Sequence, residues 1–321
     1  MKPFYILILN LFLLQSFATE KDSLVFLELT PFKTNKPILF IDDCDACGCA
    51  ASGGAMGFSS MLNKQFIGVR YFSQHYKTND GLYANSAWQN ENYNTTQIWS
   101  KIAISNKIEI STLIPYQSHN RTTTTDIETI SGLGDITIMG MYSVLNKKNE
   151  NETKNHIVKV GTGLKLPTGS FNESNNGSIN PSFQLGTGSW DYLFLAEYTF
   201  TKNNWGINNM INYNLKTANK KEYKFGNQLN YNITGYRILK KNDYSFLPQL
   251  GVMGEVYDTN EQYKQTIQNT AGSILLAKAG VEIGLKAWSL GVHAMQPLQQ
   301  NLLNGNVESK FRWSLNLNYA L

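Results

Sequence analysis

All three cysteines of this 321-residue chain fall within one short segment, at Cys44, Cys47 and Cys49. Thiolates at this close spacing can bind a soft ion such as Cu(I) or Zn(II), because two or three sulfurs can hold such an ion without a preformed fold. The segment is therefore a predicted copper or zinc site.

A fourth ligand for that ion could come from Asp42, Asp43 or His75. The alternative interpretation is one local disulfide plus a free thiol, which an oxidising exported compartment favours. No second Cys-x-x-Cys pair completes a tetrahedral site, so both interpretations stay open.

The histidines are too few and too scattered to indicate a catalytic triad, at His75, His119, His156 and His293. Ser189 and Asp191 with His293, or His119 with Asp126, could be hydrolytic partners only if the fold brought base, nucleophile and orienting group together. Gly-x-Ser-x-Gly, His-Glu-x-x-His and phosphate-loop motifs do not occur. We therefore expect a protein that is not an enzyme and has no catalytic residues.

The charge pattern excludes several other classes. The chain has 28 Lys and Arg against 24 Asp and Glu, intermingled rather than gathered in one stripe, so no footprint for nucleic acid is present. Mean hydropathy is −0.30, and the long apolar run lies at the start of the chain, which excludes a bundle of membrane-spanning helices.

The first residues match a secretory signal peptide. Lys2 precedes the apolar stretch Phe4–Leu14, and Ser16 and Ala18 supply small residues before a cleavage site. The stretch is shorter than the roughly 17–25 residues that a membrane anchor needs. We expect three parts: a signal peptide over residues 1–18, a periplasmic, plug-like segment with the cysteines over residues 19–63, and an outer-membrane barrel over residues 64–321.

Alternation with a period of two recurs along the third part. On the last strand one face is apolar, with Phe311, Trp313, Leu315, Leu317, Tyr319 and Leu321, and the other carries Lys310, Arg312, Ser314, Asn316, Asn318 and Ala320. Trp205 and Tyr213 lie eight residues apart on one face, as do Tyr223 and Tyr231. On strands that rise ~3.3 Å per residue and tilt ~40°, this spacing is roughly 20 Å, close to the apolar band between two aromatic girdles.

The expected links alternate in length. Long links are Thr78–Glu91, Gln117–Ser131, Thr168–Asn180, Thr259–Asn269 and Gln299–Val307, and short ones are Ser105–Asn106, Lys202–Asn204, Lys240–Asp243 and Lys286–Ala287. Two links break the rule, Asn146–Asn155 and Thr217–Lys221. The pattern favours an all-β, transmembrane, antiparallel up-and-down barrel of about 12 strands in the bacterial outer membrane, with a periplasmic or secreted β-sandwich as the alternative.

Three motifs resemble a known family. Gly132-Leu133-Gly134-Asp135, Leu166-Pro167-Thr168-Gly169 and Gln184-Leu185-Gly186-Thr187-Gly188-Ser189 resemble the outer-membrane barrels named for the meta-pathway of phenol degradation, and Cys-x-x-Cys-Gly-Cys resembles a Bacteroidetes-type branch of that group. The resemblance covers about Phe66 to Leu321. It implies a transporter and supplies no catalytic residues.

Two functions follow as hypotheses. The first is a channel for small, including hydrophobic, solutes, and the alternative is a non-conducting surface barrel whose cysteines bind copper or act in redox chemistry. The expected partners are outer-membrane lipid, a small-molecule solute and the barrel assembly machinery, whose recognition signal the ending Tyr319-Ala320-Leu321 resembles. No nucleic-acid partner is expected.

Overall fold

The computed structural model describes residues 60–79, 87–122, 126–148, 154–175, 178–179 and 183–321. All of these described residues belong to one compact unit. Within the described ranges no helix is long and apolar enough to cross a membrane. The predicted signal peptide and most of the predicted plug-like segment lie outside these ranges.

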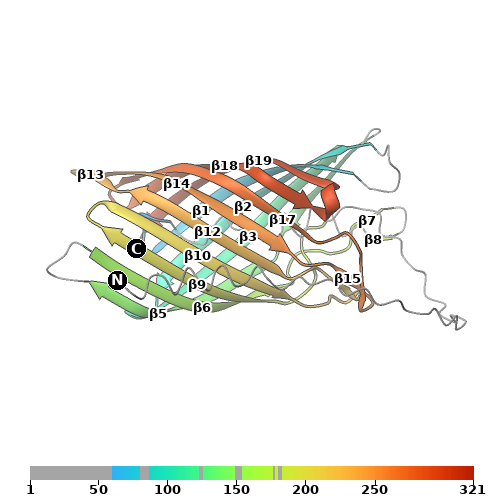
Figure 1. Cartoon of the computed structure of the whole chain (residues 1–321), viewed down its shortest axis with the longest axis horizontal. Coiled ribbons are helices and arrows are strands. Elements are labelled where there is room, and N and C mark those ends of the chain that lie inside the picture. Colours follow the sequence, from blue (N-terminus) through green and yellow to red (C-terminus); the bar gives the residue numbers. More distant parts are fainter. Residues whose placement is uncertain (1–59, 80–86, 123–125, 149–153, 176–177, 180–182) are drawn as a thin grey trace, which may run out of the picture. The chain divides into compact units, whose positions relative to one another are not determined.

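The described chain forms a closed, antiparallel barrel of twelve strands (Figure 1). Two of the twelve are interrupted, so that β4 and β5 continue one another beside β3, and β12 and β13 beside β14. The strands are β1 (Phe66–Thr78), β2 (Gln89–Ala103), β3 (Ile108–Thr122), β4 (Ile127–Leu133), β5 (Ile136–Lys148), β6 (Lys154–Leu166), β9 (Asp191–Lys202), β10 (Trp205–Lys216), β12 (Gln228–Arg237), β13 (Leu239–Lys241), β14 (Tyr244–Tyr257), β17 (Gly272–Leu285), β18 (Trp288–Leu302) and β19 (Val307–Ala320).

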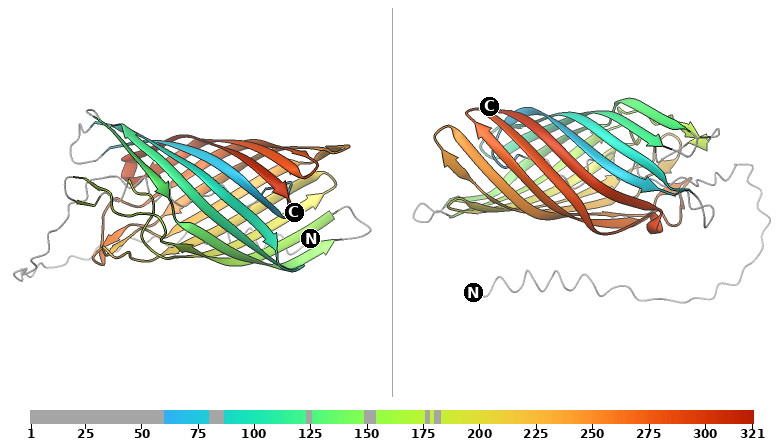
Figure 2. Two further views of the ribbon diagram at one scale, coloured as in Figure 1. Left: turned by 180° about the vertical axis from the view of Figure 1, so that it is seen from behind. Right: turned by 90° about the horizontal axis from the view of Figure 1, so that it is seen from above.

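Pairing of the first strand with the last closes the barrel. Phe66 of β1 lies opposite Ala320 of β19, and the ladder continues to Thr78 opposite Val307. Both strand ends at Phe66 and Ala320 therefore lie at the same rim, as Figure 2 shows for the C-terminus. This confirms the expected all-β, up-and-down fold and excludes the β-sandwich.

Several short elements of secondary structure lie at the opposite rim. They are β7 (Ser174–Asn175), β8 (Ser178–Ile179), β11 (Tyr223–Lys224), β15 (Glu261–Gln262), β16 (Gln265–Thr266) and the 3-10 turn η3 (Leu303–Gly305). They lie in the longer links, at the right of Figure 1. By the general rule that outer-membrane barrels have short periplasmic turns, we call this rim the outer end and the opposite rim the turn end.

The last strand shows the expected division between lipid and lumen. Leu315, Leu317 and Tyr319 are exposed on the outside, whereas Asn316 and Asn318 are buried inside. Lys310 departs from the prediction, because it is exposed next to the exposed Phe311. A register shift between β1 and β19 causes this, since the bulge places two successive residues on one side and reverses the alternation.

Aromatic residues ring the turn end. Trp205, Tyr244, Trp288 and Tyr319 are all exposed next to turns or at the strand end, and Trp288 packs edge-on against Tyr319 with ring centroids 5.0 Å apart. Trp205 and Tyr213 are both exposed, at 59% and 39%, which confirms that they share the lipid face. An apolar band with an aromatic border is the exterior of a membrane-spanning barrel.

Three expectations about the outer end were wrong. Tyr223 and Phe225 do not continue the lipid face of Tyr231 but are buried in a link, because the strand itself begins only at Gln228. The link at Thr217 is long rather than short, since it reaches Asn227. The long link predicted over Gln117–Ser131 is instead mostly paired strand, with β3 and β4 extending beside each other.

The lipid face can be tested with Leu315→Arg. Leu315 is exposed in the middle of β19, so an arginine there should cost roughly 2–4 kcal/mol in lipid and reduce assembly. Ser273→Arg is the matched control, because Ser273 is also exposed but lies next to the outer end of β17, where the cost should be about 0–1 kcal/mol. Urea unfolding of the barrel in lipid vesicles measures both, and equal costs would contradict the assigned membrane depth.

Candidate functional site

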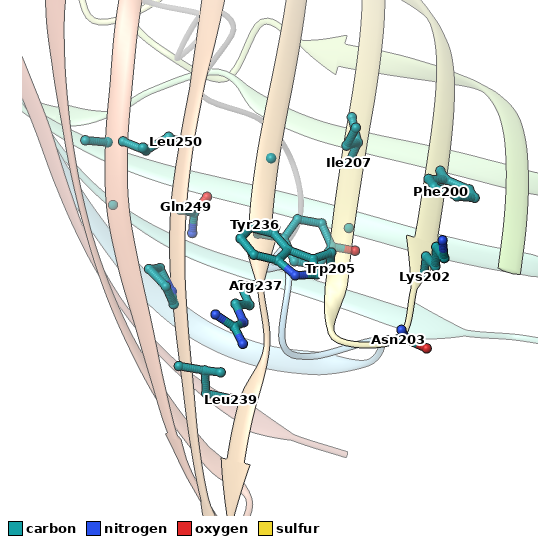
Figure 3. A pocket seen from close by; sticks show the side chains of 15 residues that line it. Phe200, Lys202, Asn203, Trp205, Ile207, Tyr236, Arg237, Leu239, Gln249 and Leu250 are labelled. Atoms are coloured by element: carbon teal, nitrogen blue, oxygen red, sulfur yellow. The ribbon is translucent and has the colours of Figure 1, made fainter. Parts of the chain in front are cut away.

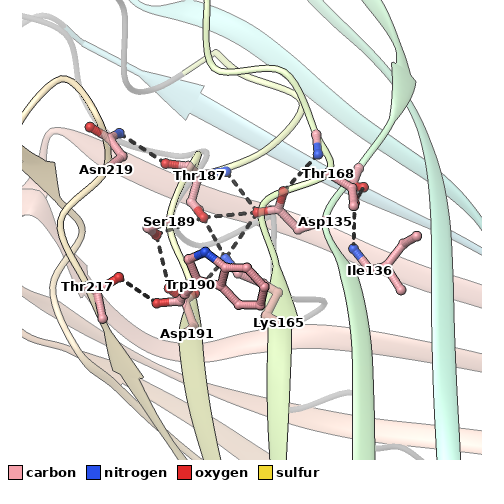
Figure 4. Close-up of polar contacts among 12 residues, drawn as sticks. Asp135, Ile136, Lys165, Thr168, Thr187, Ser189, Trp190, Asp191, Thr217 and Asn219 are labelled. Atoms are coloured by element: carbon pink, nitrogen blue, oxygen red, sulfur yellow. Dashed lines mark hydrogen bonds and ion pairs between the residues drawn. The ribbon is translucent and has the colours of Figure 1, made fainter.

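A buried charge cluster joins the barrel wall to the link between β6 and β9 (Figure 4). Lys165, at the end of β6, lies with its Nζ 2.5 Å from a carboxylate oxygen of Asp191 and 3.2 Å from one of Asp135. Asp135 sits in the break between β4 and β5, and Asp191 begins β9. All three side chains are almost completely buried, so each charge depends on the others for compensation.

Thr187 ties the link itself into this cluster. Its backbone N–H and its hydroxyl both donate to Asp135 Oδ2, at 2.9 Å each, and Lys165 donates to its Oγ1 at 2.7 Å. Gly169 N–H donates to the other oxygen of Asp135 at 3.0 Å. One carboxylate therefore holds both ends of the link, at residue 169 and at residue 187.

Glycine is required at two positions beside that carboxylate. A Cβ on Gly186 would lie 2.4 Å from Asp135 Oδ1, and a Cβ on Gly169 would lie 2.7 Å from the carbonyl oxygen of Leu185. Gly169 and Gly186 thus let two stretches of backbone approach each other at the cluster. The three motifs that carried the family resemblance converge on this one point.

The same link reaches the outer part of the lumen through Phe183. Its buried ring lies edge-on to Tyr93, with centroids 6.4 Å apart, and the guanidinium of Arg121 lies 4.7 Å from its centroid. Arg121 is paired with buried Glu91 at 2.6 Å. Phe183 therefore occupies space between the walls, packed on a charge pair.

The facing wall supplies a second buried pair and an apolar cluster. Arg312 Nη1 lies 2.7 Å from Glu255, and the Arg312 guanidinium lies 5.6 Å from the ring centroid of Tyr76. Together with Phe183 the cluster contains Tyr76, Tyr93, Met253, Tyr257, Ile274, Leu276, Met295, Leu302, Leu303 and Val307. The outer part of the lumen thus holds a continuous cluster of packed, buried side chains.

Two further links at the outer end are hydrogen-bonded to, or packed against, the link between β6 and β9. Asn219 Nδ2 donates to the carbonyl of Thr187 at 3.0 Å, and Asn260 Nδ2 donates to the Tyr223 hydroxyl at 2.9 Å. Phe171 of the first link packs with Tyr223 and Phe225 in a small buried cluster. The described parts of the links of residues 167–190, 217–227 and 258–271 are therefore connected to one another, and we call them the lid.

At the turn end, the residues that precede β1 are hydrogen-bonded to side chains of the barrel wall. The carboxylate of lumen-facing Glu282 accepts from Ser60 Oγ at 2.8 Å and from the backbone N–H groups of Met61 and Leu62 at 3.1 and 3.2 Å. Asn63 Nδ2 donates to Ser289 Oγ at 2.6 Å. We call residues 60–63 the latch segment.

A large recess lies on the outside of the barrel rather than in the lumen (Figure 3). It has a volume of about 1060 Å³ and is lined mainly by outward-facing residues of β9, β10, β12, β13 and β14, including Trp205, Ile207, Leu239 and Leu250. The guanidinium of Arg237 lies 5.0 Å from the Trp205 ring centroid at its turn-end border. An apolar groove with a cationic border is suited to lipid.

The candidate metal ligands Cys44, Cys47 and Cys49 lie outside the described residues. His75, the proposed fourth ligand, interacts with Asn92 and with Ser73 Oγ, the latter at 3.3 Å. In the part of the chain that the structure describes, no group of three His, Cys, Asp or Glu side chains could hold a metal ion. The metal site stays a prediction.

The candidate hydrolytic residues have other partners. Ser189 Oγ donates to Asp191 at 3.0 Å, but His293, a lumen residue of β18, interacts with Gln249 at 2.9 Å and with Ser314 at 3.4 Å. His119 interacts with Gln117 at 2.9 Å, and Asp126 accepts from the N–H of Ile127. Neither pairing is assembled into a nucleophile, base and orienting group.

The comparisons with known proteins agree with this architecture. A model of the family described as "Putative MetA-pathway of phenol degradation" matches residues 84–282, more than half of the chain. The chain belongs to this family. No curated protein matches it by sequence.

Among solved structures, an outer membrane channel from Pseudomonas putida F1 is similar, with a TM-score of 0.62 and 15% identity over 82% of this chain and 98% of that one. The β domain of the Bordetella autotransporter BrkA has a TM-score of 0.46 and 10% identity, covering 81% of this chain and 100% of that one. The family member described here is an outer-membrane β-barrel, as its apolar exterior and closed ladder require.

Removing the central cation should release the lid. Lys165→Met leaves Asp135 and Asp191 buried without a counter-charge, which should cost about 3–5 kcal/mol. Chymotrypsin added to intact cells should then cut at Phe171 or Phe183, which are buried in the native protein.

Lys224→Met is the matched control, because it removes a partly exposed pair with Glu261 in the same lid, worth no more than about 1 kcal/mol. Resistance of Lys165→Met to chymotrypsin, equal to that of the control, would contradict the anchoring role.

Proposed function

We propose that this protein is a gated outer-membrane channel for small solutes, with both ends of its lumen closed in the state described. The main observation behind this proposal is that residues outside the strands lie in the lumen at both ends of the barrel. Phe183 of the lid packs into the cluster in the outer part of the lumen, and the latch segment is hydrogen-bonded to Glu282 at the turn end. A barrel filled by its own strands would have no such parts to move.

The contacts of these parts support a gate. The latch segment is held at Glu282 by a serine hydroxyl and two backbone N–H groups, all of which water can replace. Phe183 is held by ring packing on Tyr93 and Arg121. Neither closure requires a strand of the barrel to unpair.

The lining supports a solute with an apolar body. Besides the outer cluster, a second buried apolar cluster lies on the inner wall and comprises Phe66, Trp99, Leu113, Met139, Met141, Leu193 and Leu195. Methionines occur in both clusters, and their flexible side chains can repack around a passing molecule. The similar structure from Pseudomonas putida F1 is described as a channel, which supports the same role here.

We also propose that the large recess on the outside of the barrel binds membrane lipid. Its apolar wall suits an acyl chain, while Lys202 and Arg237 at the turn-end border suit a phosphate. In this proposal, the recess is where the expected lipid partner binds.

Planar-bilayer conductance of the full-length protein tests the channel. Phe183→Ala combined with Ser60→Gly removes one contact from each closure, so open events should be at least about tenfold more frequent than in the unmodified protein, given about 1.4 kcal/mol or more lost. Trp88→Ala, which changes an exposed aromatic residue, should leave the frequency unchanged. Silence of all these proteins would contradict the channel.

The contact between side chains across the lumen favours the second candidate, a non-conducting barrel whose cysteine segment binds a soft metal or acts in redox chemistry. For that function, metal analysis of anaerobically purified protein should find about one copper or zinc ion per chain, lost in the Cys44→Ser, Cys47→Ser, Cys49→Ser variant. Metal-free protein with one reactive thiol would instead indicate a disulfide and a spare cysteine.

A further inference from the structure

Cations dominate the row of outward-facing side chains at the turn-end border of the large recess. Trp205 of β10 lies directly opposite Lys202 of β9 on one side and Arg237 of β12 on the other, and Lys154 of β6 lies opposite Lys202. Residues directly opposite each other on antiparallel strands point to the same face of the sheet. The row therefore places two lysines, an arginine and an indole side by side on the outside of the barrel, with no acidic residue among them.

Two of these cations receive no counter-charge from the described part of the chain. Within those ranges neither Lys202 nor Arg237 forms an ion pair with a carboxylate. Both side chains are exposed, and Figure 3 shows Trp205 between them. The Arg237 guanidinium lies 5.0 Å from the Trp205 ring centroid. Stacking on the indole holds the guanidinium at the border and leaves its N–H groups available to a ligand.

The apolar floor of the recess begins next to this row, on the side away from the turns. Ile207, Gly235, Leu250 and Ala279 lie opposite one another across β10, β12, β14 and β17, so large and small side chains alternate. A Cβ on Gly235 would have only the carbonyl oxygen of Leu250 nearby, at 3.8 Å. The missing side chain at Gly235 therefore leaves a hollow between Ile207 and Leu250, which are 46% and 70% exposed.

A break in strand pairing lies beside this hollow. β12 pairs with β14 up to Tyr236 opposite Gln249, and β13 resumes with Leu239 opposite Phe246. Pro248, which lines the recess, lies in the gap and has no N–H to donate across it. The recess has a volume of about 1060 Å³, just above the roughly 300–1,000 Å³ typical of ligand pockets. It is therefore large enough for acyl chains.

We propose that the recess selects an anionic phospholipid of the periplasmic leaflet over a zwitterionic one. The inference rests on the lipid-binding recess proposed above and adds the headgroup and the leaflet. The cations lie at the turn end, which is the periplasmic side, and the apolar floor lies further into the membrane. This order matches a lipid whose phosphate faces the periplasm. A lipid of the outer leaflet would bring its chains, not its phosphate, to Lys202 and Arg237.

The charge of the row favours an anionic headgroup over a zwitterionic one. In phosphatidylethanolamine the phosphate is balanced by an ammonium group of the same lipid, and that group would lie beside Lys202 and Arg237. Phosphatidylglycerol carries its phosphate on an uncharged alcohol, so both cations can bind it without repulsion. Trp205 suits the same depth, because indole rings prefer the level of the headgroups.

Native mass spectrometry of the full-length protein in detergent tests the headgroup. The protein is titrated with phosphatidylglycerol, or with phosphatidylethanolamine that has the same acyl chains, and bound lipid is counted. Phosphatidylglycerol should bind at least about tenfold more tightly, because each cation near the headgroup attracts an anionic lipid. The Lys202→Gln, Arg237→Gln variant should lower this ratio at least about fivefold. Lys107→Gln, which changes an exposed lysine in the turn between β2 and β3, should retain the ratio.

Filling the hollow tests the apolar part of the site. Gly235→Leu should weaken the binding of both lipids at least about tenfold, because the added side chain occupies space that the acyl chains need. Gly140→Leu is the matched control, since a Cβ on Gly140 also meets open space. Gly140 lies between the exposed side chains of Ile138 and Tyr142 on β5, which does not line the recess. This control should bind both lipids as the unmodified protein does.

The outcomes separate headgroup selection from lipid binding. Equal affinities for the two lipids, or a ratio that the Lys202→Gln, Arg237→Gln variant leaves unchanged, would overturn the selection of an anionic lipid. The recess would still be a lipid site if Gly235→Leu weakened the binding of both. Unweakened binding by Gly235→Leu would overturn the lipid site together with the selection. A dimer that Gly235→Leu dissociates would show that a second copy of this chain fills the recess, which would also overturn the proposal.

Discussion

The closed backbone ladder is the constraint on which the rest of the structure depends. Within lipid no water can satisfy peptide groups, so every strand must pair on both sides, and β1 completes the ring by pairing with β19. Once the ring is closed, each strand sends alternate side chains inward. Twelve strands enclose a narrow space, and that space must accept whatever the inward positions carry.

Charges placed inward by this alternation cannot stay unpaired at such depth. Glu91 forms an ion pair with Arg121, Glu255 with Arg312, and Lys165 with two aspartates. The partners in each pair are far apart in the sequence. Such pairs are costly to bury and add little stability on balance, but losing one partner is severe. They therefore act as fixed points, and the lid is attached at two of them, through Thr187 and Phe183.

The fold was accessible from the sequence because alternation with a period of two, as on Leu315–Asn318, is a local signal. The lid was not, since Tyr223 and Phe225 alternate like a strand yet pack against Phe171, a contact set by tertiary structure. The motif around Asp135 marked the family, but its role as the partner of Lys165 and Thr187 depends on three distant segments meeting. The latch on Glu282 had no sequence signal, because an isolated inward glutamate does not name its donors.

In the proposed channel, the lid and the latch segment are held by different kinds of contact, and this difference sets the order in which we expect them to open. Lifting the lid would separate Thr187 from a buried carboxylate that also balances Lys165, so the cost falls on a charge cluster. Releasing the latch segment exchanges neutral donors on Glu282 for water at the rim, and Glu282 can then turn toward Lys278, which lines the same small cavity. The carboxylate keeps a partner throughout, so opening at the turn end leaves no charge uncompensated. If the protein is the gated channel proposed above, we therefore expect the turn end to open first.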